Sequence, residues 1–307
     1  MNTSLNIKEN KTAISWILLL FLAICWGFSF ILVKKVVVHF SAIELGAGRI
    51  FIASLALLPW AIKYYKQFPR DNFKFLALSG LLGYLIPAII FGFVGSRLNS
   101  SLSGTLNSTT PLFVLVIGAL FFGGKKIVNF QIFGLLIAFI GSLMLILSGG
   151  GGNNHLNFNN PYVIIVVLAT IMYGFNANII GKHLSDVKPI IISAYSLLFV
   201  GIISFVCLLF TDFFSKIFLP ENFELLLYFL ILGAINSGLA AVLFNYILQI
   251  SSPVFASSVT YLIPVVATFA GLFDGEKIGI WYYLGMAFIL VGIYLLNKKA
   301  KIAVIKD

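Results

Sequence analysis

The fold of this chain is predicted best from one stretch, Asn-Ser-Ser-Leu-Ser-Gly-Thr-Leu-Asn-Ser-Thr-Thr-Pro at 99–111, which leads into an apolar run. A similar stretch returns in the second half, where Ser-Pro-Val-Phe-Ala-Ser-Ser-Val-Thr-Tyr-Leu-Ile-Pro at 252–264 leads into another apolar run. In both, small and hydroxylated residues come first, a proline follows (Pro111, Pro264), and a short turn then precedes a glycine-spaced apolar run. The sequence therefore contains an internal duplication.

The composition excludes a soluble globular protein. Of the 307 residues, 60% are hydrophobic and 10% are charged, and the mean hydropathy is +1.06. So few polar side chains cannot cover a globule of this size, and the chain is predicted to be an all-α membrane protein. The net charge of +10 comes from lysines at the ends of apolar runs, where they orient a protein in a membrane. Nucleic acid is therefore not an expected partner.

The apolar runs are long enough to be transmembrane helices, because about 20 residues cross the ~30 Å hydrocarbon core of a bilayer. Charged residues, Asn, Pro or Gly mark the ends of ten such runs. The predicted transmembrane helices are 13–33, 43–62, 73–95, 102–122, 130–148, 161–181, 189–210, 225–247, 254–273 and 278–296.

A linker rich in Gly and Asn at 149–160 follows the fifth predicted helix. It separates two five-helix repeats, 1–148 and 161–297, and a tail at 298–307 follows the second repeat. Because five is odd, the second repeat enters the membrane from the opposite side, which predicts a 5+5 inverted repeat around a central cavity.

The positions of Lys and Arg predict the orientation. If the N-terminus is cytoplasmic, the segments on the cytoplasmic side hold most of the 20 Lys and Arg residues, as the positive-inside rule requires. We therefore expect a multi-pass protein of the cell (inner) membrane, with both termini cytoplasmic and the linker extracytoplasmic.

Uncharged polar residues and large rings lie well inside predicted helices of both repeats. As a set they favour a cavity that binds a zwitterion or another polar metabolite. For each polar residue alone, the alternative is an interhelical hydrogen bond worth roughly 0.6 kcal/mol, and for each ring it is plain packing. The candidate substrate-binding residues are Trp26, Arg49, Asn107, Tyr173, Asn176, Asn236, Thr260 and Tyr261, and the expected helix breaks are Pro111 and Pro264.

Arg49 lies about a third of the way into the second predicted helix. An arginine in hydrocarbon costs at least ~2.5 kcal/mol, so its side chain should face protein or a wet cavity. It either binds a substrate carboxylate with its bidentate fork, or it caps carbonyl groups of a neighbouring helix. Glu44 is about 140° away around the helix, so we expect it to pair with Lys34 or Lys35 at the membrane interface instead.

The sequence does not place the His and acidic residues of a metal site or a catalytic site inside the predicted helices. His39, His155 and His183 fall in predicted loops, and no acidic residue occupies the middle of a predicted helix. We therefore expect no enzyme, catalytic residue, cofactor or metal ion. A membrane-embedded enzyme and a passive channel are the alternatives to a secondary transporter, which the two matched halves favour. The expected partners are the lipid bilayer and a small-molecule metabolite, and a homodimer is left open.

Several segments together carry a resemblance to a known family. These are Trp-Gly-Phe-Ser at 26–29 beside Tyr-Gly-Phe-Asn at 173–176, Ala-Gly-Arg-Ile-Phe at 47–51, the two proline-containing stretches, and Gly275-Glu276 before the last helix. Over about 13–297, the chain resembles the EamA family of the drug/metabolite transporter superfamily. The resemblance implies a basket of helices around a cavity built mainly from the first, third, fourth, sixth, eighth and ninth helices, with the fifth and tenth outside. It also implies export or exchange of amino acids or other small metabolites.

Overall fold

The computed structural model describes residues 2–95, 97, 106–123, 129–148, 161–273 and 280–303. All regular secondary structure in these ranges is helical, as predicted. The linker at 149–160 and Gly275-Glu276 lie outside the described residues.

In the first half, α2, α3 and α7 begin within one residue of the predicted positions, whereas α1 begins earlier and α6 later than predicted. They are α1 (Asn2–Val36), α2 (Ala42–Lys63), α3 (Phe73–Gly80), α4 (Ile86–Gly95), α6 (Thr110–Phe121) and α7 (Asn129–Ser148). The helices of the second half are α8 (Tyr162–His183), α9 (Pro189–Leu209), α10 (Phe213–Ile217), α11 (Phe223–Leu230), α12 (Ala240–Ile250), α13 (Pro253–Ser257), α14 (Val259–Phe273) and α15 (Ile280–Ala303). Short 3-10 turns lie at η1 (Tyr65–Gln67), η2 (Arg70–Asn72) and η4 (Pro220–Asn222).

Six helical stretches are long and apolar enough to cross a membrane. They are Lys11–Val36, Ala42–Lys63, Arg70–Gly95, Tyr162–His183, Pro189–Leu209 and Pro220–Ile250. The other four predicted spans fall on shorter apolar helices, at Thr110–Phe121, Phe130–Met144, Pro253–Val266 and Tyr283–Leu295. The prediction of a helical membrane protein is confirmed, and the number of ten spans stays a prediction.

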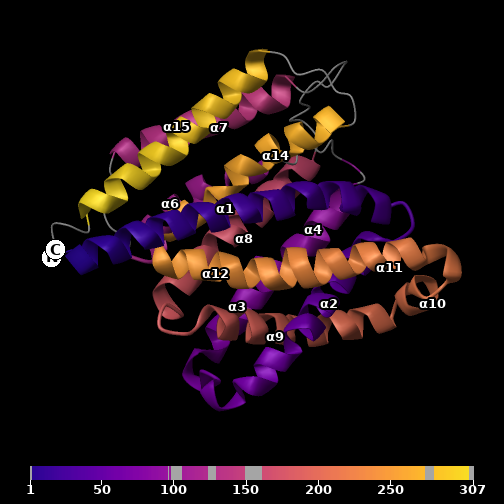
Figure 1. Ribbon diagram of the computed structural model, residues 1–307. Helices are drawn as coiled ribbons and strands as arrows, with labels where there is room; N and C mark the ends of the chain where they lie inside the picture. Colours follow the sequence, from indigo (N-terminus) through magenta and orange to yellow (C-terminus); the bar gives the residue numbers. More distant parts are fainter. Residues whose placement is uncertain are drawn as a thin grey trace.

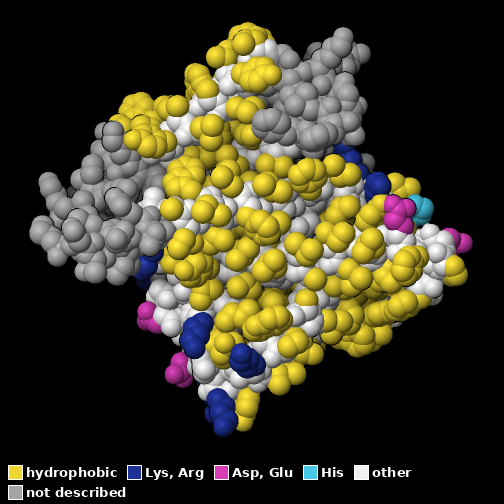
Figure 2. Space-filling model, viewed as in Figure 1, with side chains coloured by type: hydrophobic (Ala, Val, Ile, Leu, Met, Phe, Trp, Pro, Cys, Tyr) yellow, Lys and Arg dark blue, Asp and Glu magenta, His cyan; other side chains and the backbone are white. Residues whose placement is uncertain are grey.

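The surface is that of a protein solvated by lipid. Figure 2 shows hydrophobic side chains over most of the visible face, with charged side chains gathered at its edges. Large apolar residues are exposed on many helices, Phe210 (85%), Ile164 (73%) and Leu120 (71%) among them. In water such a surface would aggregate, whereas in a bilayer it contacts acyl chains.

Helices from the two halves pack against each other in pairs. α7 packs along α15, α2 along α9, α1 along α14 and α6 along α8, and the pair α7 and α15 lies apart at the top of Figure 1. Glycines permit the closest approach: a Cβ on Gly141 would lie 2.5 Å from the Gly285 carbonyl oxygen, and one on Gly292 would lie 2.5 Å from that of Gly134. Without side chains at these points the two backbones come into direct contact.

Two of the predicted helices, 73–95 and 225–247, each contain a π-helical segment. One is η3 (Leu81–Leu85), between α3 and α4, and the other is η5 (Ile231–Leu239), between α11 and α12. A π-helical turn inserts extra backbone into a helix and occurs frequently at functional sites. Both segments face the central cavity described below, through Tyr84 in η3 and Ser237 in η5.

The helix interruptions lie a few residues earlier than expected. Pro111 sits in the first turn of α6, where proline is well accommodated because the N–H it lacks would have no helical partner. Pro264 lies inside α14, which continues past it, and α13 and α14 separate at Ser258 instead. Pro264 is therefore not a helix break, whereas Pro111 follows the interruption at Ser108 and Thr109. Hydroxyl side chains at both turns donate to carbonyl groups three residues earlier and so compete with the helical hydrogen bonds.

Candidate substrate cavity

A central cavity lies between the two halves, and about 190 Å³ of it is open to the centres of water molecules. Since one water needs roughly 10–15 Å³ by this measure, the cavity has room for a small metabolite. Its lining comes from α1, α2, η3, α4, the turn before α6, the start of α6, α8, η5, α12, α13 and α14. The polar or aromatic lining residues are Trp26, Ser29, Lys34, Arg49, Tyr84, Phe91, Asn107, Thr110, Tyr173, Asn176, Asn236, Ser237, Phe244, Ser257 and Thr260.

The lining matches the helices that the family resemblance implied, with one addition. Helix α2 contributes Arg49 and Ile50, although the second helix was not among the expected walls. Among the side chains that the structure describes, its partner α9 contributes none to the lining, and neither do α7 and α15. The fifth and tenth helices thus lie outside the cavity, as expected.

Seven of the eight candidate residues line the cavity. The exception is Tyr261, whose ring is fully buried and whose hydroxyl donates to the Leu135 carbonyl oxygen at 3.3 Å. Tyr261 is therefore a core residue and not a cavity wall. The reason is helical geometry: successive residues point about 100° apart, so when Thr260 faces the cavity, Tyr261 faces α7.

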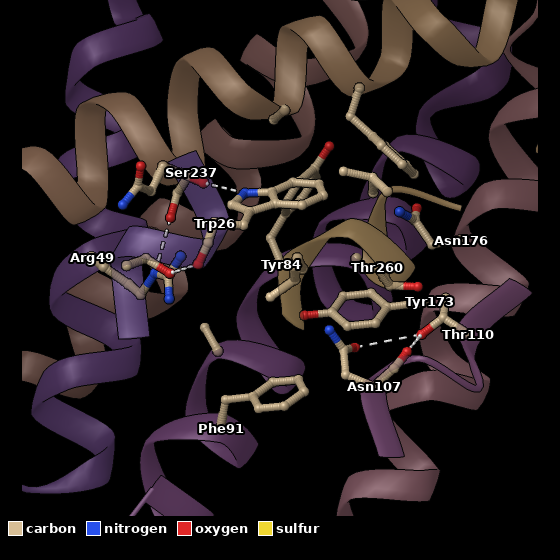
Figure 3. Close-up of a pocket in the computed structure, with 18 of the residues that line it drawn as sticks. Trp26, Arg49, Tyr84, Phe91, Asn107, Thr110, Tyr173, Asn176, Ser237 and Thr260 are labelled. Carbon is tan, nitrogen blue, oxygen red and sulfur yellow. Dashed lines mark hydrogen bonds between the residues drawn. The ribbon is translucent and has the colours of Figure 1, made fainter. Parts of the chain in front are cut away.

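Arg49 lies beside Ser237 at one side of the cavity (Figure 3). Its Nε donates to Ser237 Oγ at 3.0 Å, and Ser237 Oγ in turn donates to the Leu232 carbonyl oxygen at 2.9 Å. The structure records no hydrogen bond of the two terminal guanidinium nitrogens and no ion pair of Arg49 with any described carboxylate. These nitrogens form the end of the guanidinium fork, which suits a carboxylate.

Aromatic rings form the middle of the cavity. Trp26 donates from Nε1 to the Asn236 carbonyl oxygen at 2.9 Å, and its ring lies 5.8 Å from that of Phe244. The Tyr173 ring stacks on Phe91 at 6.4 Å. The Trp26 hydrogen bond explains how η5 is held against α1, since the indole satisfies a carbonyl of the π-helical segment.

The far side of the cavity is polar and uncharged. Thr110 Oγ1 donates to the Asn107 carbonyl oxygen at 2.7 Å, and Asn176 is only 4% exposed. The side-chain oxygen of Asn176 has no hydrogen-bond partner, and its amide lies over Gly83, where a Cβ would overlap it. A buried amide without a partner costs about 1–3 kcal/mol, so a donor group of a ligand would stabilise this side.

Sequence reasoning missed several lining residues, of which Tyr84 is the most informative. It lies in an apolar run with no polar neighbour in sequence, so residue type alone gives no signal. The duplication does give one: Gly80 and Gly233 occupy matching positions, and Tyr84 and Ser237 each follow four residues later. Tyr84 could have been found as the counterpart of Ser237.

The cavity is open at one end and sealed at the other. Val33, Lys34 and Gly95 form the open end, where Lys34 and Gly95 are exposed. The Trp-Gly-Phe motif of the first half matches the Tyr-Gly-Phe motif of the second, and the same offset makes Ile180 the counterpart of Val33. Gly80 matches Gly233, and that offset makes Leu248 the counterpart of Gly95. Both counterparts are buried in the largest hydrophobic cluster.

Aromatic contacts reinforce the sealed end. The rings of Phe75 and His183 stack at 3.9 Å, and Trp16 meets Phe255 edge to face at 5.4 Å. Trp16 lies about five turns from Lys34 along α1, which places these contacts at the end of the bundle opposite the opening.

Glu44 is held differently from the expectation. It accepts a hydrogen bond from Lys216 Nζ at 3.1 Å and one from the Ser41 backbone N–H at 2.7 Å, while Lys35 bonds Tyr228. Glu44 thus caps α2 and links it to the segment after α9, and the proposed pairing with Lys34 or Lys35 was wrong. The loop before α2 turns Glu44 toward Lys216, because Ser41 and Glu44 form a capping box.

We predict that Glu44→Gln lowers stability and leaves the cavity chemistry unchanged. The buried carboxylate (2% exposed) bonds a lysine that is 37% exposed, so its loss should cost on the order of 1–2 kcal/mol, measured as a lower melting temperature in detergent. Glu224→Gln is the control, because its pair with Lys35 is exposed and should contribute little. An unchanged melting temperature together with loss of a substrate-induced proton flux would instead make Glu44 a coupling group.

Membrane helices around a partly polar central cavity are typical of membrane transporters. The model of the EamA-like transporter family matches residues 13–147 and again 160–298. The chain therefore belongs to the EamA family, within the drug/metabolite transporter superfamily, as its sequence suggested.

Known proteins agree with this assignment. YedA of Escherichia coli K12, described as an uncharacterized inner membrane transporter, is 25% identical over 300 residues, which cover 93% of this chain and 94% of YedA. YedA of Escherichia coli O157:H7 matches equally. A solved crystal structure with a TM-score of 0.72 covers 95% of this chain and 98% of its own, and at 14% identity it shows a shared fold alone.

Proposed function

We propose that this protein is a secondary transporter of the inner membrane that exports or exchanges amino acids or other small polar metabolites by alternating access. The observation that carries the proposal is the cavity, with unpaired guanidinium nitrogens at Arg49, an unpaired amide oxygen at Asn176 and aromatic rings between them. A substrate with a carboxylate and a donor group complements both sides.

Contacts at matching positions support the inverted repeat that alternating access needs. Gly27 lies against Val266 of α14, and Gly174, its counterpart, lies against Phe113 of α6. The family model also matches once in each half. Two equivalent halves allow two equivalent arrangements, one open to each side of the membrane. A passive channel is disfavoured by the sealed end.

The cavity lining favours exchange or facilitated diffusion over proton coupling. Proton-driven transporters commonly use a carboxylate or histidine within the membrane as the titrating group. Among the cavity-lining residues that the structure describes, none is Asp, Glu or His.

A reconstitution experiment tests the proposal. The purified protein is placed in liposomes loaded with labelled amino acids and common metabolites, and efflux is followed with and without unlabelled substrate outside. We expect saturable efflux that external substrate accelerates. Flux that never saturates would indicate a channel, and no flux above protein-free liposomes for any compound would contradict the proposal.

The orientation has its own test. With both termini cytoplasmic, the linker and the open end at Lys34 face the extracytoplasmic side. We expect Gly151→Cys, in a Cys25→Ala, Cys207→Ala background, to react with an impermeant maleimide in intact cells. A cysteine added after the C-terminal residue is the matched control and should react only after lysis. The reverse pattern would invert the orientation.

A further inference from the structure

A second polar cluster lies behind the cavity wall, between η3, α9 and α12. Asn245 Nδ2 donates to Ser193 Oγ at 2.8 Å and to the Tyr84 hydroxyl at 3.3 Å. Ser193, Ser196 and Asn245 are completely buried, and Tyr84 lines the cavity. Tyr84 therefore stands between this cluster and the cavity.

The cluster is incompletely hydrogen-bonded in this conformation. Neither Ser196 Oγ nor Asn245 Oδ1 has a hydrogen-bond partner, although Ser193 and Ser204 on the same helix bond carbonyl groups four residues earlier. Buried polar groups are nearly always paired, and each exception calls for an explanation. A ligand, a water molecule or another conformation can supply the missing partners.

The two halves of the protein relate this cluster to the Arg49 site. A Cβ on Gly233 would lie 2.9 Å from the backbone oxygen of Arg49, and a Cβ on its counterpart Gly80 would lie 2.6 Å from the backbone oxygen of Ser196. Arg49 and Ser196 therefore hold matching positions on α2 and α9. In the same way Ser237, which bonds Arg49, matches Tyr84.

The matching positions Arg49 and Ser196 differ in accessibility in this conformation, whereas Ser237 and Tyr84 both line the cavity. Arg49 and Ser237 line the cavity that opens beside Lys34, whereas Ser196 lies behind Tyr84 on the side of the sealed end, at 0% exposure. When two inverted repeats exchange conformations, each half takes the environment of the other. Opening the sealed end would then give Ser196 the exposure that Arg49 has here.

We propose that Tyr84, Ser193, Ser196 and Asn245 form a second substrate subsite, which is hidden here and lines the cavity when it opens to the opposite side. This inference rests on the proposed function. The subsite offers hydroxyl groups and an amide and carries no charge, so it accepts hydrogen bonds from ammonium or hydroxyl groups of the substrate. The carboxylate stays with Arg49.

Cysteine labelling of the purified protein tests the subsite. In a Cys25→Ala, Cys207→Ala background, Ser196→Cys should react with a hydrophilic maleimide when the opposite conformation forms. If that state holds about 0.1–10% of the molecules, labelling should be about 10- to 1000-fold slower than for Ser237→Cys. Ser204→Cys, also fully buried on α9, is the matched control and should not label. Ser193→Cys is a second reporter should Ser196→Cys fold poorly.

A cross-link tests whether labelling of Ser196→Cys requires the sealed end to open or arises from local fluctuations of the helices. Adding Phe75→Cys and His183→Cys and bridging them with a short dimaleimide should hold the sealed end shut. We expect this to stop labelling of Ser196→Cys and to leave Ser237→Cys unchanged, as followed by mass spectrometry. Labelling of Ser196→Cys that is as slow as that of Ser204→Cys, or that persists after bridging, would overturn the inference. Since efflux is measured separately on the parent protein, this failure is distinguishable from failure of the proposed function.

Discussion

Arg49→Gln is expected to abolish transport of carboxylate-bearing substrates while folded yield stays near that of the parent protein. The variant removes the one cation among the deep lining residues and keeps a side chain that can bond Ser237 Oγ. A hydrogen bond to a charged group contributes about 1.5–3 kcal/mol, so losing a bidentate pair should weaken binding by at least ~100-fold. The measurement is efflux from liposomes together with the yield of monodisperse protein.

A second substitution separates charge from geometry. Arg49→Lys keeps the charge and loses the fork, so apparent affinity for carboxylated substrates should fall by about 10-fold or more. Substrates without a carboxylate should be transported normally by both variants. Lys63→Gln, which removes a charge from the exposed end of the same helix, is the control and should transport like the parent.

The competing explanation has a different signature. If Arg49 serves mainly to hold η5 through Ser237, both substitutions should reduce folded protein and slow every substrate equally. Equal losses of yield and transport would therefore remove Arg49 from the substrate site.

Gly141→Leu is expected to cause the largest loss of stability among single changes outside the cavity. Even the first atom of a side chain would lie 2.5 Å from the Gly285 carbonyl oxygen and 2.8 Å from the Ile289 nitrogen, and both are backbone atoms that cannot rotate away. Overpacking of this kind costs about 1–3 kcal/mol, and a larger side chain must push α7 and α15 apart. We expect a much lower melting temperature and folded yield.

The contact between α7 and α15 at Gly141 lies outside the cavity, so Gly141→Leu is expected to affect stability and not substrate binding. Because the described side chains of α7 and α15 contribute nothing to the cavity lining, the protein that does fold should keep its apparent substrate affinity. Gly95→Ala is the control, since a Cβ there has its nearest neighbour at 3.8 Å, and its melting temperature should not change. A Gly141→Leu protein with normal stability would show that the two helices do not meet at this glycine.

The sequence alone was sufficient for the class of protein and for seven of the residues that line the cavity. Apolar runs that reach bilayer length can be read locally, because the bilayer imposes the same length on every spanning helix. Polar residues such as Asn107, Asn176 and Asn236 stand out inside such runs, because hydrocarbon penalises every polar group that lacks a partner. The internal duplication also showed which positions of the first half correspond to which positions of the second half.

Only the tertiary structure decided how each helix is rotated and which neighbour it meets. Tyr261 and Thr260 are adjacent in sequence, yet one is core and the other faces the cavity, because 100° of helical rotation separates them. The pairing of Glu44 with Lys216 and of Arg49 with Ser237 joins residues 172 and 188 positions apart, which no local pattern encodes. The position of Arg49 within an apolar run shows that its side chain needs a partner inside the membrane. Which residue becomes that partner depends on the helix that lies opposite, and this is determined by the packing of the helices.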